Sequence, residues 1–163
     1  MNLSSAARGR LTIAASFAAA LLLAIVPGPD WAEPFRPEWV GLVLIYWCMA
    51  TPQRVGVGVG WSVGLMLDVL YGSLLGQHAL AKALIAYLTV RFHTQLRMFP
   101  RWQQAASVLV LVAINHLLVL WAKALASEAP VGWSYWTPSV VSMLVWPWLF
   151  VILRDIRRRA KLA

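Results

Sequence analysis

Six apolar runs follow one another along the chain, separated by short breaks that contain charged residues, prolines or glycines. The runs cover residues 11–26, 39–50, 55–75, 79–90, 105–126 and 140–153. A helix needs about 20 residues to cross the hydrocarbon core of a bilayer, so only the third and fifth runs can span it unaided. The second and fourth runs must use flanking residues or be shielded by other helices. The pattern predicts an all-α integral membrane protein with six short, irregular transmembrane helices, at about 11–26, 37–51, 55–75, 77–91, 104–126 and 138–153.

The composition agrees with this interpretation and limits what else the chain can hold. Of the 163 residues, 61% are hydrophobic and 12% are charged, whereas soluble domains have about 45–50% and about 25%. Six spans leave about 40 residues for all loops and tails, so we expect one polytopic membrane domain over residues 1–163. Arg8 and Arg10 before the first run are typical of a signal peptide, but no cleavage site of small residues follows Val26. We therefore expect the first run to remain as a helix.

The positions of the basic residues orient the six spans, because lysine and arginine collect in cytoplasmic loops. With a cytoplasmic N-terminus, eleven basic residues fall on the cytoplasmic side: Arg8, Arg10, Arg54, Arg91, Arg97, Arg101, Arg154, Arg157, Arg158, Arg159 and Lys161. The opposite loops contain Arg36 and four of the six acidic residues. Both termini are therefore predicted to be cytoplasmic. Membrane topology accounts for the net charge of +8, and nucleic-acid binding is not expected.

Small residues recur at every fourth position through the third run. They are Gly56, Gly60, Gly64, Asp68, Gly72 and Gly76. In lipid, such a strip allows another helix to approach the backbone closely. Packing within the protein's own bundle is the favoured interpretation, and contact with a second protein is the alternative.

Polar residues inside the apolar runs are the candidates for a buried site. Asp68 and Lys82 would lie at similar depth on either side of a tight turn, and an unpaired charge there is costly, so we expect them to pair. Asn115 and His116, midway along the fifth run, can bond across helices or line a polar cleft. No second acidic residue lies within the runs, which favours a structural role for Asp68 over a proton or cation site.

The sixth run and the tail that follows it carry two further candidate surfaces. Trp146 and Trp148 flank Pro147, which is expected to kink the helix. Their rings can pack within the bundle or form a contact face for another helix. The tail residues Arg154, Arg157, Arg158, Arg159 and Lys161 are expected to attract anionic lipids or a cytoplasmic partner.

No catalytic or metal-binding arrangement is recognisable in the sequence. It contains no HExxH motif, no pair of carboxylates at one depth and no phosphate-binding loop. We therefore predict no enzyme activity, no cofactor and no metal site.

Several segments in a fixed order carry a family resemblance. They cover residues 35–39, 45–47, 52–58, 64–68, 72–76, 102–104 and 144–148. From about Arg10 to Arg158 the chain resembles the proteobacterial MreD family of rod shape-determining proteins. The resemblance implies an inner-membrane subunit of the cell-elongation machinery. Such proteins associate with the single-span protein MreC, the MreB filament, RodZ, the RodA glycosyltransferase and its partner penicillin-binding protein. It also implies a fold similar to the S-components of energy-coupling-factor transporters, with no catalytic residues to carry over.

Two functions are compatible with these features. The favoured one is a non-enzymatic scaffold subunit of the Rod complex that binds MreC and supports MreB-linked peptidoglycan synthesis and rod cell shape. The glycine strip and the kinked sixth run are then its expected docking faces, and a homodimer remains open. The alternative is a small-molecule binding or transport subunit related to S-components, which needs several convergent polar groups in a concave site.

Overall fold

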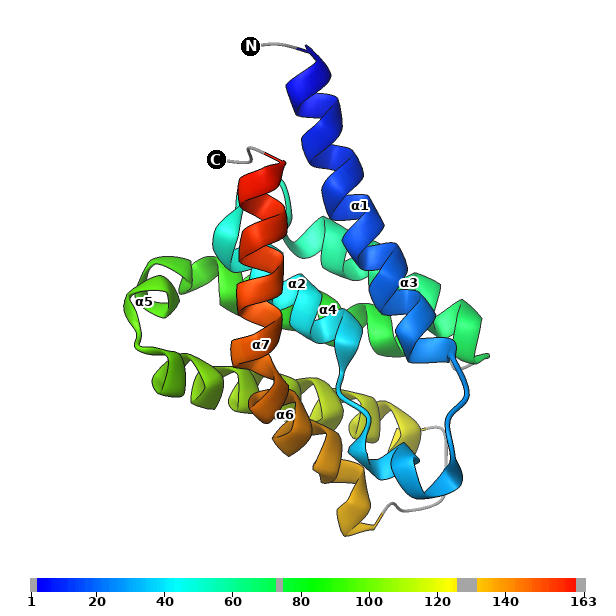
Figure 1. Cartoon of the computed structure of the whole chain (residues 1–163). Helices are drawn as coiled ribbons and strands as arrows, with labels where there is room; N and C mark the ends of the chain where they lie inside the picture. The colour runs from blue at the N-terminus through cyan, green and yellow to red at the C-terminus, as the bar shows by residue number, and fades with distance from the viewer. Residues whose placement is uncertain (1–2, 73–74, 126–131, 161–163) are drawn as a thin grey trace.

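The computed structural model describes residues 3–72, 75–125 and 132–160, and its regular elements are helices (Figure 1). In chain order they are α1 (Leu3–Ile25), the 3-10 helix η1 (Asp30–Phe35), α2 (Trp39–Ala50), α3 (Val57–Tyr71), α4 (Gln77–Arg91), α5 (His93–Met98), α6 (Arg101–Leu125), the 3-10 helix η2 (Trp133–Trp136) and α7 (Thr137–Arg159). No strand occurs in this part of the chain, so the predicted all-α fold is confirmed. The start of α1 and the end of α7 lie in the upper part of Figure 1, whereas η1 and the start of α7 lie in the lower part.

Three of the described helices are long and apolar enough to cross a membrane, within Ser5–Ile25, Arg101–Leu125 and Thr137–Arg159. The chain is therefore an all-α membrane protein. Helices α2, α3 and α4 are shorter, with 12, 15 and 15 residues. A helix lies over each of the six predicted spans, and α5 is an additional helix in the break between the fourth and fifth spans. Six complete crossings stay a prediction.

Helix α2 lies at the centre of the bundle. Every residue from Val40 to Ala50 is buried, and α1, α4, α5, α6 and α7 all pack against the helix. The Trp47 indole is completely buried, and its Nε1 donates a hydrogen bond to Ser16 Oγ of α1 at 2.8 Å. A helix of 12 residues is too short to span a bilayer alone. Here neighbouring helices, in place of lipid, surround it.

The glycine strip has two different structural roles. In α3, a side chain at Gly60 would meet the Lys82 carbonyl oxygen at 2.8 Å, and one at Gly64 would meet the His78 carbonyl oxygen at 2.5 Å and the Ala79 backbone. These two glycines therefore let α3 and α4 pack backbone to backbone. Gly72 and Gly76 instead adopt positive φ values of 64° and 99° at the facing ends of these helices, with open space around them.

Helix periodicity explains this division of the strip. A four-residue repeat drifts about 40° around a helix at each step, because a turn takes 3.6 residues. Consequently Gly60 and Gly64 are the glycines of the strip that face α4, while nothing lies within 4 Å of the place that a Cβ at Gly56 would occupy. The part of the strip that permits close approach is already covered within the chain.

Trp146, Pro147 and Trp148 of α7 also have different surroundings. Trp146 is completely buried, and its Nε1 donates to Gln104 Oε1 of α6 at 3.0 Å. Trp148 is 76% exposed. Pro147 lies inside α7, which continues through it from Thr137 to Arg159. The expected docking face around these residues is thus reduced to Trp148, because the other tryptophan fastens α7 to α6.

Replacing Gly64 by leucine tests the close packing of α3 against α4. Gly64→Leu is expected to lower the free energy of unfolding in detergent by at least about 1–3 kcal/mol, because the side chain would collide with the α4 backbone. Gly58→Leu is the matched control, since Gly58 lies in the same helix with nothing within 4 Å. Equal destabilisation by both variants, measured by reversible unfolding in mixed micelles, would contradict close packing at Gly64.

Candidate functional site

A completely buried lysine lies at the centre of a polar cluster in the interior of the bundle. Lys82 Nζ, from α4, donates hydrogen bonds to Glu38 Oε1 at 2.8 Å and to Asn115 Oδ1 of α6 at 2.8 Å. An ammonium group taken out of water is costly unless charge and hydrogen-bond partners replace the water. Glu38 supplies the opposite charge, and Asn115 supplies a second acceptor.

Glu38 connects this cluster to two further helices. It immediately precedes α2, and its backbone N–H donates to Ser142 Oγ of α7 at 2.9 Å. Gly41 makes room for the carboxylate side chain, because a Cβ there would meet Glu38 Cγ at 2.9 Å. The Glu38 side chain is 23% exposed. One residue thus joins the start of α2 to α4 and α7 while keeping access to solvent.

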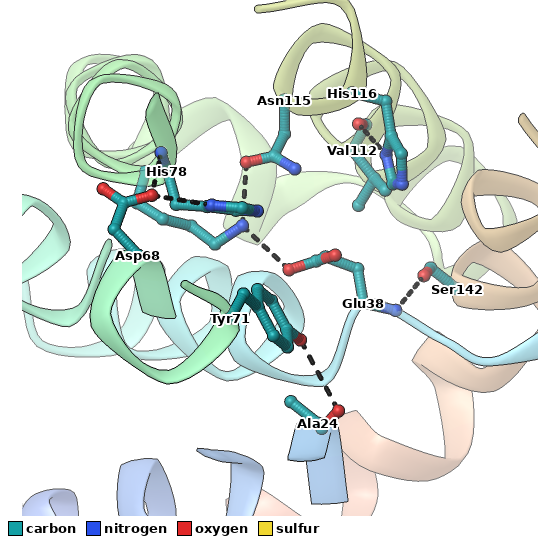
Figure 2. Close-up of polar contacts among 10 residues, drawn as sticks. Ala24, Glu38, Asp68, Tyr71, His78, Val112, Asn115, His116 and Ser142 are labelled. Atoms are coloured by element: carbon teal, nitrogen blue, oxygen red, sulfur yellow. Dashed lines mark hydrogen bonds and ion pairs between the residues drawn. The ribbon is translucent and has the colours of Figure 1, made fainter. Parts of the chain in front are cut away.

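Asp68 binds the N-terminus of α4. Its Oδ2 accepts the backbone N–H of Gly76 at 2.9 Å and of Ala79 at 3.4 Å, and its Oδ1 accepts that of His78 at 2.9 Å. The ring Nδ1 of His78 also lies 2.8 Å from Oδ1 (Figure 2). The first N–H groups of a helix lack intrahelical acceptors, and the helix dipole favours negative charge there. Asp68 therefore acts as a helix cap supplied by the preceding helix.

The expected ion pair between Asp68 and Lys82 does not form. The short turn after α3 places Asp68 beside the free N–H groups of α4, and these N–H groups satisfy its oxygens. Lys82 lies further along α4 and turns toward Glu38 and Asn115. Each charged group is therefore satisfied, but by partners other than those predicted.

Helix α6 places Asn115 and His116 next to the Lys82 cluster. The ring Nδ1 of His116 lies 2.9 Å from the Val112 carbonyl oxygen, and the His116 carbonyl accepts the Tyr135 hydroxyl at 2.7 Å. Burial, with a smaller contribution from the Glu38 charge, raises the pKa of Tyr135 to about 12. This phenol therefore stays protonated near neutral pH and remains a donor. Figure 2 shows Asn115 and His116, both from α6, lying beside Glu38, which immediately precedes α2.

A cavity of about 370 Å³ opens beside the cluster. Glu38, His116, Tyr71 and Arg36 are among its lining residues. Arg36 also closes the end of α1, since its Nη2 donates to the carbonyl oxygens of Leu23 at 2.7 Å and Val26 at 2.6 Å. Among the described residues no group of three or more histidine, cysteine, aspartate or glutamate side chains is arranged to hold a metal ion.

The tail residues lie apart from this cluster. Arg154 and Arg157 line a different cavity, while Arg158 and Arg159 are exposed and Lys161 lies outside the described residues. Glu38 is the site residue that sequence reasoning missed, because it lies just outside the apolar run 39–50. Two signals pointed to it: a lysine within an apolar run needs a carboxylate, and Gly41 follows Glu38 at a distance of three residues.

A double-mutant cycle tests the charge pairing inside the cluster. Glu38→Ala is expected to lower the free energy of unfolding by about 3 kcal/mol, because it leaves the Lys82 ammonium without a counter-charge. Glu38→Ala combined with Lys82→Met should cost much less than the sum of the two single changes. Lys123→Met replaces a lysine that has no carboxylate partner in the described structure, so it should add independently to Glu38→Ala. Additivity in both cycles would refute the Glu38–Lys82 pair.

Comparison with known proteins places this arrangement in a family. A family model described as rod shape-determining protein MreD matches residues 6–156, which include every residue of the cluster. The Rod shape-determining protein MreD of Haemophilus influenzae (strain ATCC 51907 / DSM 11121 / KW20 / Rd) is 34% identical over 151 residues, covering 93% of this chain and 93% of that relative. No solved structure gives a significant match, so the likeness to S-components stays a prediction. On these matches, the chain belongs to the MreD family of rod shape-determining proteins.

Proposed function

We propose that the chain is a non-enzymatic scaffold subunit of the bacterial cell-elongation complex, held in the inner membrane by several helices with both termini in the cytoplasm. In this proposal it binds MreC and works beside MreB, RodZ, RodA and the associated penicillin-binding protein in peptidoglycan synthesis and rod shape. Membership of the MreD family, over residues 6–156, is the observation that carries the proposal.

The chemistry of the polar cluster supports a scaffold over an enzyme. Lys82, Glu38, Asn115 and Asp68 bond one another or backbone groups, and their bonds hold helix to helix. Such a network fixes the relative positions of α2, α3, α4 and α6. A rigid bundle with a defined outer shape is what a scaffold in a membrane requires.

A groove between α1 and α3 is the best docking surface for a partner's membrane helix. It encloses about 690 Å³ and continues into a second apolar hollow of about 380 Å³ around Leu65, Val69 and Leu70. Ala14 and Ala18 of α1 line one wall, and small residues allow close helix approach in lipid. Arg10 and Arg54 lie among the lining residues, and both belong to the predicted cytoplasmic side.

The shape and polarity of this groove favour a single membrane helix as its occupant. Apart from Arg10, Gln53 and Arg54, its lining side chains are apolar, so it can bury an apolar helix over much of its length. MreC, a single-span protein, would supply one such helix. The glycine strip cannot serve instead, because α4 already covers Gly60 and Gly64.

Substitution on two faces of α1 tests the docking surface. Ala18→Trp should reduce recovery of co-purified MreC by about fivefold or more, because the indole would fill the groove. Ala19→Trp is the matched control, since Ala19 is exposed on α1 but does not line the groove. Photo-crosslinkers at Ala18 and Met66 should capture the MreC membrane helix.

Three results would redirect or overturn this docking site. Crosslinking at Trp148 in place of the groove would assign docking to α7. Crosslinking to a second copy of the chain would identify the groove as a homodimer contact. Retention of MreC by Ala18→Trp, in a variant that stays folded, would remove the groove from the proposal.

A small-molecule binding subunit is the second candidate function. The cavity of about 370 Å³ favours it, because the partly exposed carboxylate of Glu38 and the side chains of His116 and Arg36 converge there. Native mass spectrometry of the purified chain distinguishes the two functions. A retained ligand that Glu38→Gln releases would support binding or transport, and a ligand-free protein that still captures MreC would support the scaffold.

A further inference from the structure

A second, larger cavity lies at the opposite end of the bundle from the Lys82 cluster, where α5, α6 and α7 meet the end of α2. It encloses about 710 Å³, and four arginines line it: Arg97, Arg101, Arg154 and Arg157. No acidic side chain is among its lining residues. All four arginines belong to the side that the charge pattern predicts to be cytoplasmic. The cavity therefore concentrates positive charge at the predicted cytoplasmic surface of the bilayer.

Backbone carbonyls and an aromatic ring position two of these arginines, Arg97 and Arg101. Arg97 Nε and Nη2 donate to the carbonyl oxygens of Met49 at 2.7 Å and Ala50 at 2.8 Å, which close the end of α2. The Arg101 guanidinium carbon lies 3.7 Å from the centre of the Phe150 ring. In the described part of the chain, none of the four guanidinium groups is paired with a carboxylate. Their charge is thus positioned but not neutralised.

Two buried donors at this cavity have no acceptor. The hydroxyl of Tyr46, a residue only 1% exposed, and Nε of Arg154 are both buried without a hydrogen-bond partner among the described residues. Buried polar groups in native proteins are almost always bonded. Both residues line the cavity, so an acceptor bound inside it would satisfy them.

We propose that this cavity binds the phosphate group of an anionic phospholipid. Guanidinium groups match phosphate oxygens in a two-pronged geometry, and several of them together can bind both non-bridging oxygens of a phosphodiester or the two phosphodiesters of cardiolipin. The lining also includes Phe99, Pro100 and Phe150, which suit the glycerol and upper acyl region of a lipid. A free phosphate would use the same arginines but gain nothing from these apolar side chains. The proposal does not depend on the scaffold function.

The test measures retention of defined lipids by the purified full-length chain. Native mass spectrometry in detergent compares phosphatidylglycerol and cardiolipin with diacylglycerol, which lacks phosphate. Arg154→Gln with Arg157→Gln should weaken retention of the anionic lipids by about tenfold or more. Arg158→Gln with Arg159→Gln removes the same charge from the same helix outside the cavity, and it should change retention less than about twofold.

Tyr46→Phe examines the unsatisfied hydroxyl separately. In lipid-free detergent its thermal stability should equal or exceed that of the parent chain, because a buried donor without an acceptor is removed. Its stabilisation by added phosphatidylglycerol should be smaller than that of the parent. Improved stability without any loss of lipid response would contradict a role for the hydroxyl in binding.

Four outcomes would overturn the proposal. Equal losses from the cavity pair and the control pair would assign binding to general surface charge. Displacement of the lipid by millimolar inorganic phosphate or pyrophosphate, with equally strong binding of those ions alone, would make a free phosphate the ligand. Binding of an acidic peptide in preference to either would make the cavity a protein contact. Retention of diacylglycerol as strong as that of phosphatidylglycerol would show that the cavity does not recognise the phosphate group.

Discussion

The charge of Lys82 is the constraint on which the arrangement of the bundle depends. A completely buried ammonium group must find a counter-charge and acceptors inside the protein. Glu38 and Asn115 meet this need only if the start of α2, α4 and α6 come together, and the backbone bond from Glu38 to Ser142 brings in α7. Apolar packing alone would tolerate small sliding of these helices in lipid, whereas these polar contacts fix their register.

The backbone N–H and carbonyl groups at the helix ends must likewise find hydrogen-bond partners inside the protein. Asp68 accepts the first N–H groups of α4, Arg36 donates to the last carbonyls of α1, and Arg97 donates to the last carbonyls of α2. In each case a charged side chain of suitable sign meets the partial charge of a helix terminus. The ends of short helices can lie inside the bundle, where charged side chains must satisfy them. Longer helices end at the bilayer surface, where water can satisfy their termini.

Apolar runs and breaks predicted the positions of the main helices well, because burial in lipid or protein demands continuous apolar sequence. Packing at Gly60 and Gly64 followed from the spacing of small residues. The partners of Lys82 could not be predicted, because Glu38 lies 44 residues away and the choice depends on how α2 enters the bundle. The different roles of Gly72 and Gly76 depended on where α3 ends, and the arginine cavity depended on tertiary proximity of α5, α6 and α7.

The enclosure of α2 has a consequence for biogenesis. This segment leaves the ribosome before α4, α6 and α7, so it must enter the membrane before most of the helices that surround it exist. During that interval a helix of 12 residues meets lipid on every face that α1 does not cover, and Glu38 still awaits Lys82 and a serine 104 residues further along the chain. Insertion and folding are thereby separated in time. Until α7 arrives, the nascent chain is an incomplete bundle in which the contacts that enclose α2 and satisfy Glu38 have not all formed.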